Sequence, residues 1–171
     1  MTLTAGLVAS VVPAMPAAAS PPECAWSMTS LPVPTGSTTA RSSVSSAASG
    51  GWVVGSGDTG NGLRWHNGQV EDLGRAFGEQ TELRDINASG VAVGQTFGDA
   101  YINNTVVYRG GGYERLPVPA GMRGVKAKAI NDAGDIVGTA NDEFTNVNVA
   151  FWPAASPGTV VVINPDPAQY Y

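Results

Sequence analysis

Ala129-Ile130-Asn131-Asp132-Ala133-Gly134-Asp135-Ile136-Val137-Gly138 is the stretch of sequence that decides the fold of this chain. Its residues 131–134 are typical of a tight turn, because Asn and Asp side chains bond nearby backbone groups and Gly takes a positive φ without steric cost. The β-branched residues Ile136 and Val137 then predict a short strand. The pattern returns twice upstream in weaker form, so we interpret the stretch as one unit of a repeat.

Two sequence landmarks recur along the chain with nearly the same spacing. The first is Gly-x-x-Val-Gly, whose copies lie 39 and 44 residues apart. The second is an aromatic residue that closes a short apolar run, at intervals of 39, 43 and 44 residues. Because both landmarks keep one rhythm, we predict tandem repeats of about 40–44 residues. The residues that define the repeat are Gly51, Gly55, Gly90, Gly94, Gly134, Gly138, Trp26, Trp65, Tyr108 and Trp152.

Each unit is expected to contain four short strands. In the last unit, residues 135–138, 149–152 and 159–163 fit strands, and a polar loop over 139–148 separates the first two. The fourth strand shows alternating apolar and polar residues, as at 125–130. Four strands in about 40–44 residues match one blade of a β-propeller. We therefore predict an all-β, incomplete β-propeller-like fold, with a β-solenoid or a sandwich of hairpins as the alternative.

The number of predicted units is not whole. Counted from Trp26, the predicted strands fill three periods and the first half of a fourth, ending near Ile163. Such an arrangement leaves open sheet edges. We predict that the chain self-associates to cover them.

The composition favours an all-β class and restricts the partners. The 171 residues include 22 Gly and 12 Pro, and only 13% are charged, which is typical of many turns and little exposed helix surface. A net charge of -5 and the absence of a basic stripe argue against a nucleic-acid partner. The single cysteine, Cys24, excludes an internal disulfide framework.

Residues 1–19 have the character of a secretory signal peptide. They are uncharged and mostly apolar, and the small residues at 17–20 suit cleavage by signal peptidase. A transmembrane anchor is the competing interpretation, but Pro13 and Pro16 interrupt the run, which is shorter than about 20 residues. We predict a secreted, extracellular protein without stable membrane insertion after cleavage. Its expected parts are a signal peptide (1–19), a short linker (20–23), a β-repeat domain (24–163) and a C-terminal tail (164–171).

The repeat element also resembles the signature of a known protein family. Residues 86–94 and 130–138 share Ile-Asn, two turn residues, Gly and an apolar strand that ends in Gly, and Asp72-Leu73-Gly74 and Ala150-Phe151 add further matches. Together these residues resemble the extracellular repeat family named for its His-Ala-Phe tripeptide, the HAF repeat. The histidine is missing, because Val149 precedes Ala150. The resemblance implies a secreted, propeller-like repeat protein with no known catalytic activity.

Few residues suggest catalysis or metal binding. His66, the only histidine, precedes an Asn-Gly turn, where we expect an exposed turn residue, and the sequence lacks the Gly-x-Ser-x-Gly elbow of many hydrolases. Asp132, Asp135 and the acidic loop 141–143 could offer oxygen ligands to calcium, but their spacing differs from a twelve-residue calcium loop. We interpret them as solvated turn residues, and we predict no catalytic, metal or cofactor site.

The recurring aromatic residues allow two interpretations. One ring per repeat is typical of a core that packs between neighbouring units. The alternative is a row of exposed rings that stack on carbohydrate. Since no catalytic constellation is present, we predict a non-catalytic module that binds a protein or a glycan. The alternative function is a hydrolase-like β enzyme whose acidic loops hold a metal.

Overall fold

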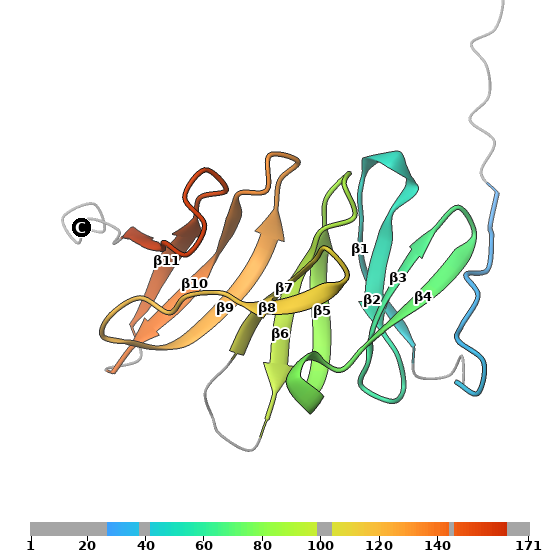
Figure 1. The fold of residues 1–171 in the computed structure, drawn as a ribbon, viewed down its shortest axis with the longest axis horizontal. Coiled ribbons are helices and arrows are strands. Elements are labelled where there is room, and N and C mark those ends of the chain that lie inside the picture. Colours follow the sequence, from blue (N-terminus) through green and yellow to red (C-terminus); the bar gives the residue numbers. More distant parts are fainter. Residues whose placement is uncertain (1–26, 38–41, 99–103, 144–145, 164–171) are drawn as a thin grey trace, which may run out of the picture.

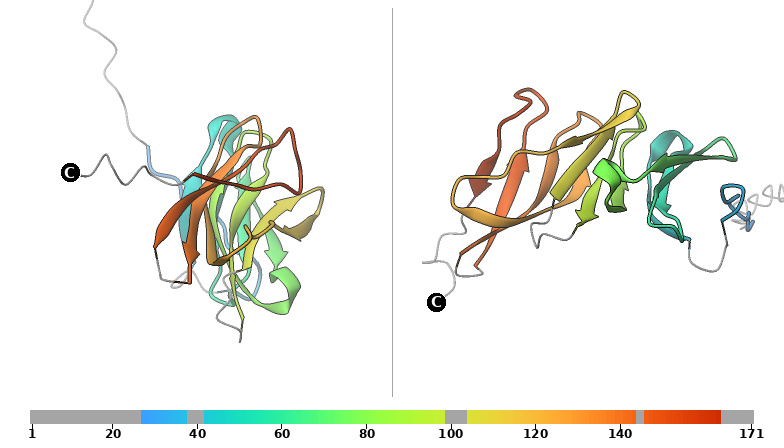
Figure 2. Two further views of the ribbon diagram at one scale, coloured as in Figure 1. Left: turned by 90° about the vertical axis from the view of Figure 1, so that its left-hand side faces the viewer. Right: turned by 60° about the horizontal axis from the view of Figure 1, so that its bottom comes forward.

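The computed structural model of the chain describes residues 27–37, 42–98, 104–143 and 146–163. In these residues the fold is all-β, as predicted, with three four-stranded antiparallel sheets that follow one another along the longest axis (Figures 1 and 2). The predicted signal peptide, Cys24, Trp26 and the tail lie outside the described residues. Over the ranges given above, no helix is long and apolar enough to span a membrane.

Every sheet is a meander in which each strand pairs with the next along the chain, and none closes into a barrel. The first sheet contains β1 (Ser43–Ala47), β2 (Val53–Ser56), β3 (Gly62–His66) and β4 (Gln69–Gly74). The second contains β5 (Gln80–Ile86), β6 (Ala92–Phe97), β7 (Asn104–Arg109) and β8 (Gly112–Arg115). The third contains β9 (Met122–Ile130), β10 (Ile136–Asp142), β11 (Val147–Trp152) and β12 (Val161–Ile163). Two short 3-10 turns, η2 (Ser49–Gly51) and η3 (Ala76–Gly78), lie before β2 and β5.

The strands group into sheets differently from the predicted units. Residues 125–130, expected as the last strand of a unit, belong to β9, which opens the third sheet. β10 continues through Asp142 and β11 begins at Val147, so that most of the predicted polar loop 139–148 is strand. The reason is that β10 pairs on both sides, with β9 and β11, and buries Ala140 completely. The described strands form three whole sheets, and residues 27–37 contain no strand, while the start of the predicted first unit at Trp26 lies outside the described residues.

The two glycines of each Gly-x-x-Val-Gly element have different structural roles. The first, at 51, 90 and 134, has a positive φ of 78°, 76° and 90° in the turn between the first two strands. The last faces a β-bulge in the first strand of its sheet, where the pairing register shifts. A Cβ atom on Gly55, Gly94 or Gly138 would overlap the carbonyl oxygen of Ser43, Glu82 or Lys126. The repeat therefore reflects a requirement of the backbone.

Two apolar interfaces join the sheets, and we call them the first seam and the second seam. The first seam packs Val54 of the first sheet against Leu83, Ile86, Ala92 and Tyr108 of the second. The second seam packs Val93 and Val107 of the second sheet against the third, which contributes Val125, Ala127, Ile130, Ile136, Ala140, Ala150 and Trp152. Burial of apolar surface in the two seams is the dominant favourable term in folding.

Polar contacts fix the offset between neighbouring sheets. The carboxylate of Asp85 on β5 accepts hydrogen bonds from Ser46 Oγ of the first sheet at 2.6 Å and from the backbone N–H of Ile130 of the third at 2.8 Å. In the turns, Asn87 Nδ2 donates to the carbonyl oxygen of Asn131 at 3.1 Å. One side chain of the second sheet thus holds all three sheets in register.

Two copies of Leu-Pro-Val-Pro, at 31–34 and 116–119, occupy matching places in the fold. Trp65 Nε1 on β3 donates to the carbonyl oxygen of Pro32 at 2.6 Å, and Trp152 Nε1 on β11 donates to that of Pro117 at 2.9 Å. Each bond satisfies the polar atom of a buried indole. Residues 31–34 therefore lie against the first sheet. Residues 116–119, in the connection between the second and third sheets, lie against the third sheet in the same way.

Candidate functional site

The three recurring aromatic residues that the structure describes lie in the core. The exposed fractions of Trp65, Tyr108 and Trp152 are 3%, 6% and 3%. These values agree with the core interpretation, because buried rings do not form a row on which carbohydrate can stack. A binding site must therefore be sought elsewhere on the described residues.

The acidic residues singled out in the sequence are engaged in turn contacts. Asp132 Oδ1 accepts the backbone N–H of Ala88 at 2.8 Å, and Asp135 Oδ1 accepts that of Ala154 at 2.9 Å. The hydrogen bond from Ala154, followed in weight by one from Asn131, lowers the pKa of Asp135 below its ordinary value. Within the described ranges, no group of three or more His, Cys, Asp or Glu side chains could hold a metal ion.

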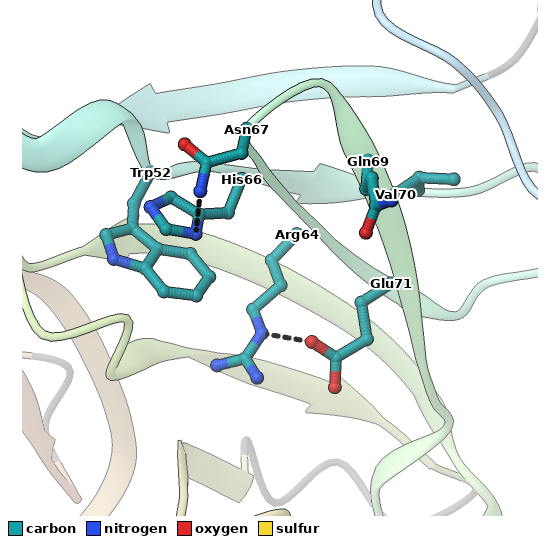
Figure 3. A pocket seen from close by; sticks show the side chains of 7 residues that line it. All are labelled: Trp52, Arg64, His66, Asn67, Gln69, Val70 and Glu71. Carbon is teal, nitrogen blue, oxygen red and sulfur yellow. Dashed lines mark hydrogen bonds and ion pairs between the residues drawn. The ribbon is translucent and has the colours of Figure 1, made fainter.

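His66 is half-buried, and it is not the exposed turn residue that the sequence predicts. Its ring stacks on Trp52, which directly precedes β2, with ring centroids 3.9 Å apart and planes inclined by 7° (Figure 3). Nε2 lies 3.1 Å from the carbonyl oxygen of Gly50, and Nδ1 lies 3.3 Å from Nδ2 of Asn67. A carbonyl oxygen only accepts, so the contact with Gly50 fits a ring whose Nε2 carries a proton.

Arg64 crosses from the first sheet to the second beside this stack. Its Nε donates to Glu71 Oε2 at 2.7 Å, and its Nη1 donates to the carbonyl oxygen of Gly90 at 2.9 Å. The guanidinium carbon also lies 4.9 Å from the ring centroid of Trp52 and 5.1 Å from that of Tyr108. Charge, hydrogen bonds and cation–π contacts together hold the side chain in one place.

These residues enclose an open pocket of about 380 Å³ at the turn end of the first seam. Trp52, His66 and Asn67 lie on one side of the pocket, and Gln69 and Glu71 of β4 lie on the other (Figure 3). The walls combine two aromatic rings with amide, guanidinium and carboxylate groups. Such a wall can pack against apolar atoms and can also donate and accept hydrogen bonds.

The second seam has a different surface at the equivalent place. Val107 is 1% exposed, and Val91 packs against the same apolar cluster. A pocket of about 40 Å³, which Arg109, Gly134 and Trp152 help to line, lies at this end. Arg109 forms an exposed ion pair with Glu114 at 2.6 Å, and its hydrogen bond lowers the pKa of Glu114. By repeat position, Val91, Val107 and Arg109 stand where Trp52, Arg64 and His66 stand in the first sheet.

Trp52 and Arg64, which line the pocket, were not identified from the sequence as site residues. The sequence did contain a signal, because both residues depart from the repeat. The other units have Val91 and Asp135 at the position of Trp52, and they have Val107 and Phe151 at the position of Arg64. Their proximity could not be read from the sequence, since Trp52 precedes β2 and Arg64 lies on β3. Comparing repeat positions for such departures would have identified both.

Comparison of the chain with protein-family models, with characterised proteins and with solved structures gives no match.

Proposed function

We propose that this protein is a secreted, non-catalytic interaction module that binds a glycan in the pocket formed by Trp52, Arg64, His66, Asn67, Gln69 and Glu71. The observation that carries the proposal is the contrast between seams. At the turn end the second seam is closed by Val91 and Val107, whereas the equivalent positions of the first seam hold Trp52 and Arg64, which line a pocket of about 380 Å³.

The chemistry of the pocket favours an uncharged ligand that is rich in hydroxyl groups. The charges of Arg64 and Glu71 compensate each other at 2.7 Å, and both ring nitrogens of His66 already lie against Gly50 and Asn67. Asn67 and Gln69 are exposed and each offers both donors and acceptors. The pocket volume lies in the range of about 300–1,000 Å³ that is usual for small-ligand sites. A neutral oligosaccharide meets these requirements better than the flat surface of a protein.

Titration with a panel of neutral oligosaccharides, followed by calorimetry, tests the proposal. We expect at least one member to bind, and we expect Glu71→Gln to weaken binding about tenfold, the loss that corresponds to one hydrogen bond to a charged group. Glu114→Gln is the matched control, because Glu114 holds the equivalent place in the second sheet and is also ion-paired, with Arg109. Binding that is absent from the whole panel, or that is equally weak in both variants, would contradict the proposal.

Secretion and membership of the HAF-repeat family belong to the same proposal. They are supported by the character of residues 1–19 and by the repeated Ile-Asn-x-x-Gly element at 86–94 and 130–138. N-terminal sequencing of protein collected from the culture medium should show a mature chain that begins after Ala19. No observation on the described residues favours a metal-dependent hydrolase, because Asp132 and Asp135 bond to backbone N–H groups in turns.

A further inference from the structure

One face of the third sheet is exposed, and its part over β11 and β12 is apolar, while Lys126 of β9 lies on the same face opposite Thr139. Residues that pair directly across antiparallel strands point to the same face, and Val137, Phe151 and Val161 form one such row. Val149 and Ile163 form the next row. Their neighbours Ile136, Ala150 and Trp152 point to the opposite face, into the second seam. The exposed fractions on the free face are 42% for Val137, 44% for Val149, 49% for Val161 and 52% for Ile163.

The repeat shows what covers such a face. Val137 corresponds to Val93 of the second sheet and to Val54 of the first, and both of these are fully buried. Val93 is covered in the second seam by Val125 and Ala127 of β9, and Val54 is covered in the first seam by Leu83 and Ile86 of β5. In each case the cover is the first strand of a following sheet. We call this side of a sheet its trailing face, and the opposite side its leading face.

The first sheet presents a leading face of the kind that fits. Val44 of β1 corresponds to Leu83 and Ala127, which are buried in the first and second seams with exposed fractions of 0% and 2%. Val44 itself is 55% exposed. It borders a pocket of about 200 Å³ that Leu31, Val33 and Trp65 also line. β1 contains no charged residue, and neither do β11 and β12.

We propose that the trailing face of the third sheet of one copy packs against the leading face of the first sheet of a second copy. Two copies that make this contact at both ends would form a ring of six four-stranded sheets, within the range of about 4–8 blades known for propellers. Because the two contacting faces differ, the contact is head-to-tail, and the ring must close for the assembly to be finite. This contact is independent of the proposed glycan site. Two exposed sheet faces, instead of an incomplete repeat unit, are now the reason to expect self-association.

Sedimentation velocity of the full chain over a wide range of concentration tests the proposal. We expect a dimer, and we expect Val149→Asp to raise its dissociation constant at least about a hundredfold, because the contact would bury an unpaired charge. Val44→Asp should do the same from the other face. Val118→Asp is the control, since Val118 is 46% exposed but lies in the connection between the second and third sheets. Circular dichroism of each variant establishes that it is folded.

Mixing the two interface variants distinguishes a head-to-tail contact from a symmetric one. The Val149→Asp variant keeps an intact leading face, and the Val44→Asp variant keeps an intact trailing face. Each alone should therefore be monomeric, and an equimolar mixture should form a dimer with one intact contact. A wild-type chain that stays monomeric at high concentration would overturn the proposal. A Val44→Asp variant that still dimerises by itself would also overturn it, because that result requires contact between two trailing faces.

Discussion

The first seam and the second seam are built on the same repeat and differ in what fills them. Both place a β-bulge opposite a glycine, and both bury an aromatic residue at the end of the third strand. The second seam is closed by valine, alanine, isoleucine and Trp152, whereas the first adds Arg64 and the stack of Trp52 on His66. The comparison teaches that the same repeated backbone arrangement can form a tightly packed interface at the second seam and a pocket at the first seam.

The strongest test of this comparison removes the tryptophan on which the second seam depends. Trp152→Ala should lower the free energy of unfolding by about 3–5 kcal/mol, because it leaves a large cavity in a packed core. Trp52→Ala should cost roughly half as much, since Trp52 is only half-buried in the first seam. Urea denaturation measures both. Equal losses would show that the two seams contribute alike to stability.

A smaller loss is expected from a feature that all three sheets share. Gly138→Ala places a Cβ atom against the carbonyl oxygen of Lys126, and the backbone must shift, at a cost of about 1–3 kcal/mol. Gly112→Ala is the control, because a Cβ atom there meets no atom within 4 Å and its φ is not positive. The measurement is again the midpoint of urea unfolding. If the two variants are equally stable, the close approach at the bulge is not a constraint.

The polar contents of the first seam should contribute little to stability. Arg64→Met preserves most of the side-chain volume and removes the charge, and Glu71 remains half-exposed to water. We therefore expect the free energy of unfolding to change by no more than about 1–2 kcal/mol, while binding at the pocket is lost. Denaturation and calorimetry on the same sample separate the two effects. A loss of stability as large as that of Trp152→Ala would make Arg64 a structural residue.

The smallest effect concerns the turn that opens β10 in the third sheet. The pKa of Asp135 is lowered by hydrogen bonds from Ala154 and Asn131. A lowered pKa means that the ionised side chain stabilises the fold above the ordinary value of about 3.8, and that this contribution disappears as the pH falls through the lower folded-state pKa. Asp135→Asn should therefore be less stable than the wild type near neutral pH and should approach it in strong acid. Unfolding curves at several pH values that keep a constant difference would contradict this.

The sequence predicts the local features of the fold well, because each depends on a few adjacent residues. The turn at 131–134, the Asn67-Gly68 hairpin turn with φ of 51° and 74°, and the burial of Trp65 and Trp152 all follow from residue type and spacing. The grouping of strands into sheets does not follow, because a periodic pattern is the same whichever strand is counted first. The pocket also escapes prediction, because Arg64 reaches Gly90 of the next sheet only after packing has set the offset between sheets.

Hydrogen exchange of the backbone amides tests the difference between the seams most directly. The Val149→Asp variant is the chain to measure, because in a monomer the first and third sheets each adjoin one other described sheet, so that their protection compares the two seams under matched conditions. We predict that amides of β9 and β10 exchange with a higher opening free energy than those of β1 and β2, because the second seam is closed by apolar packing and the first contains a polar pocket. Equal protection, or greater protection in β1 and β2, would contradict the division of the two seams into a structural joint and a binding site.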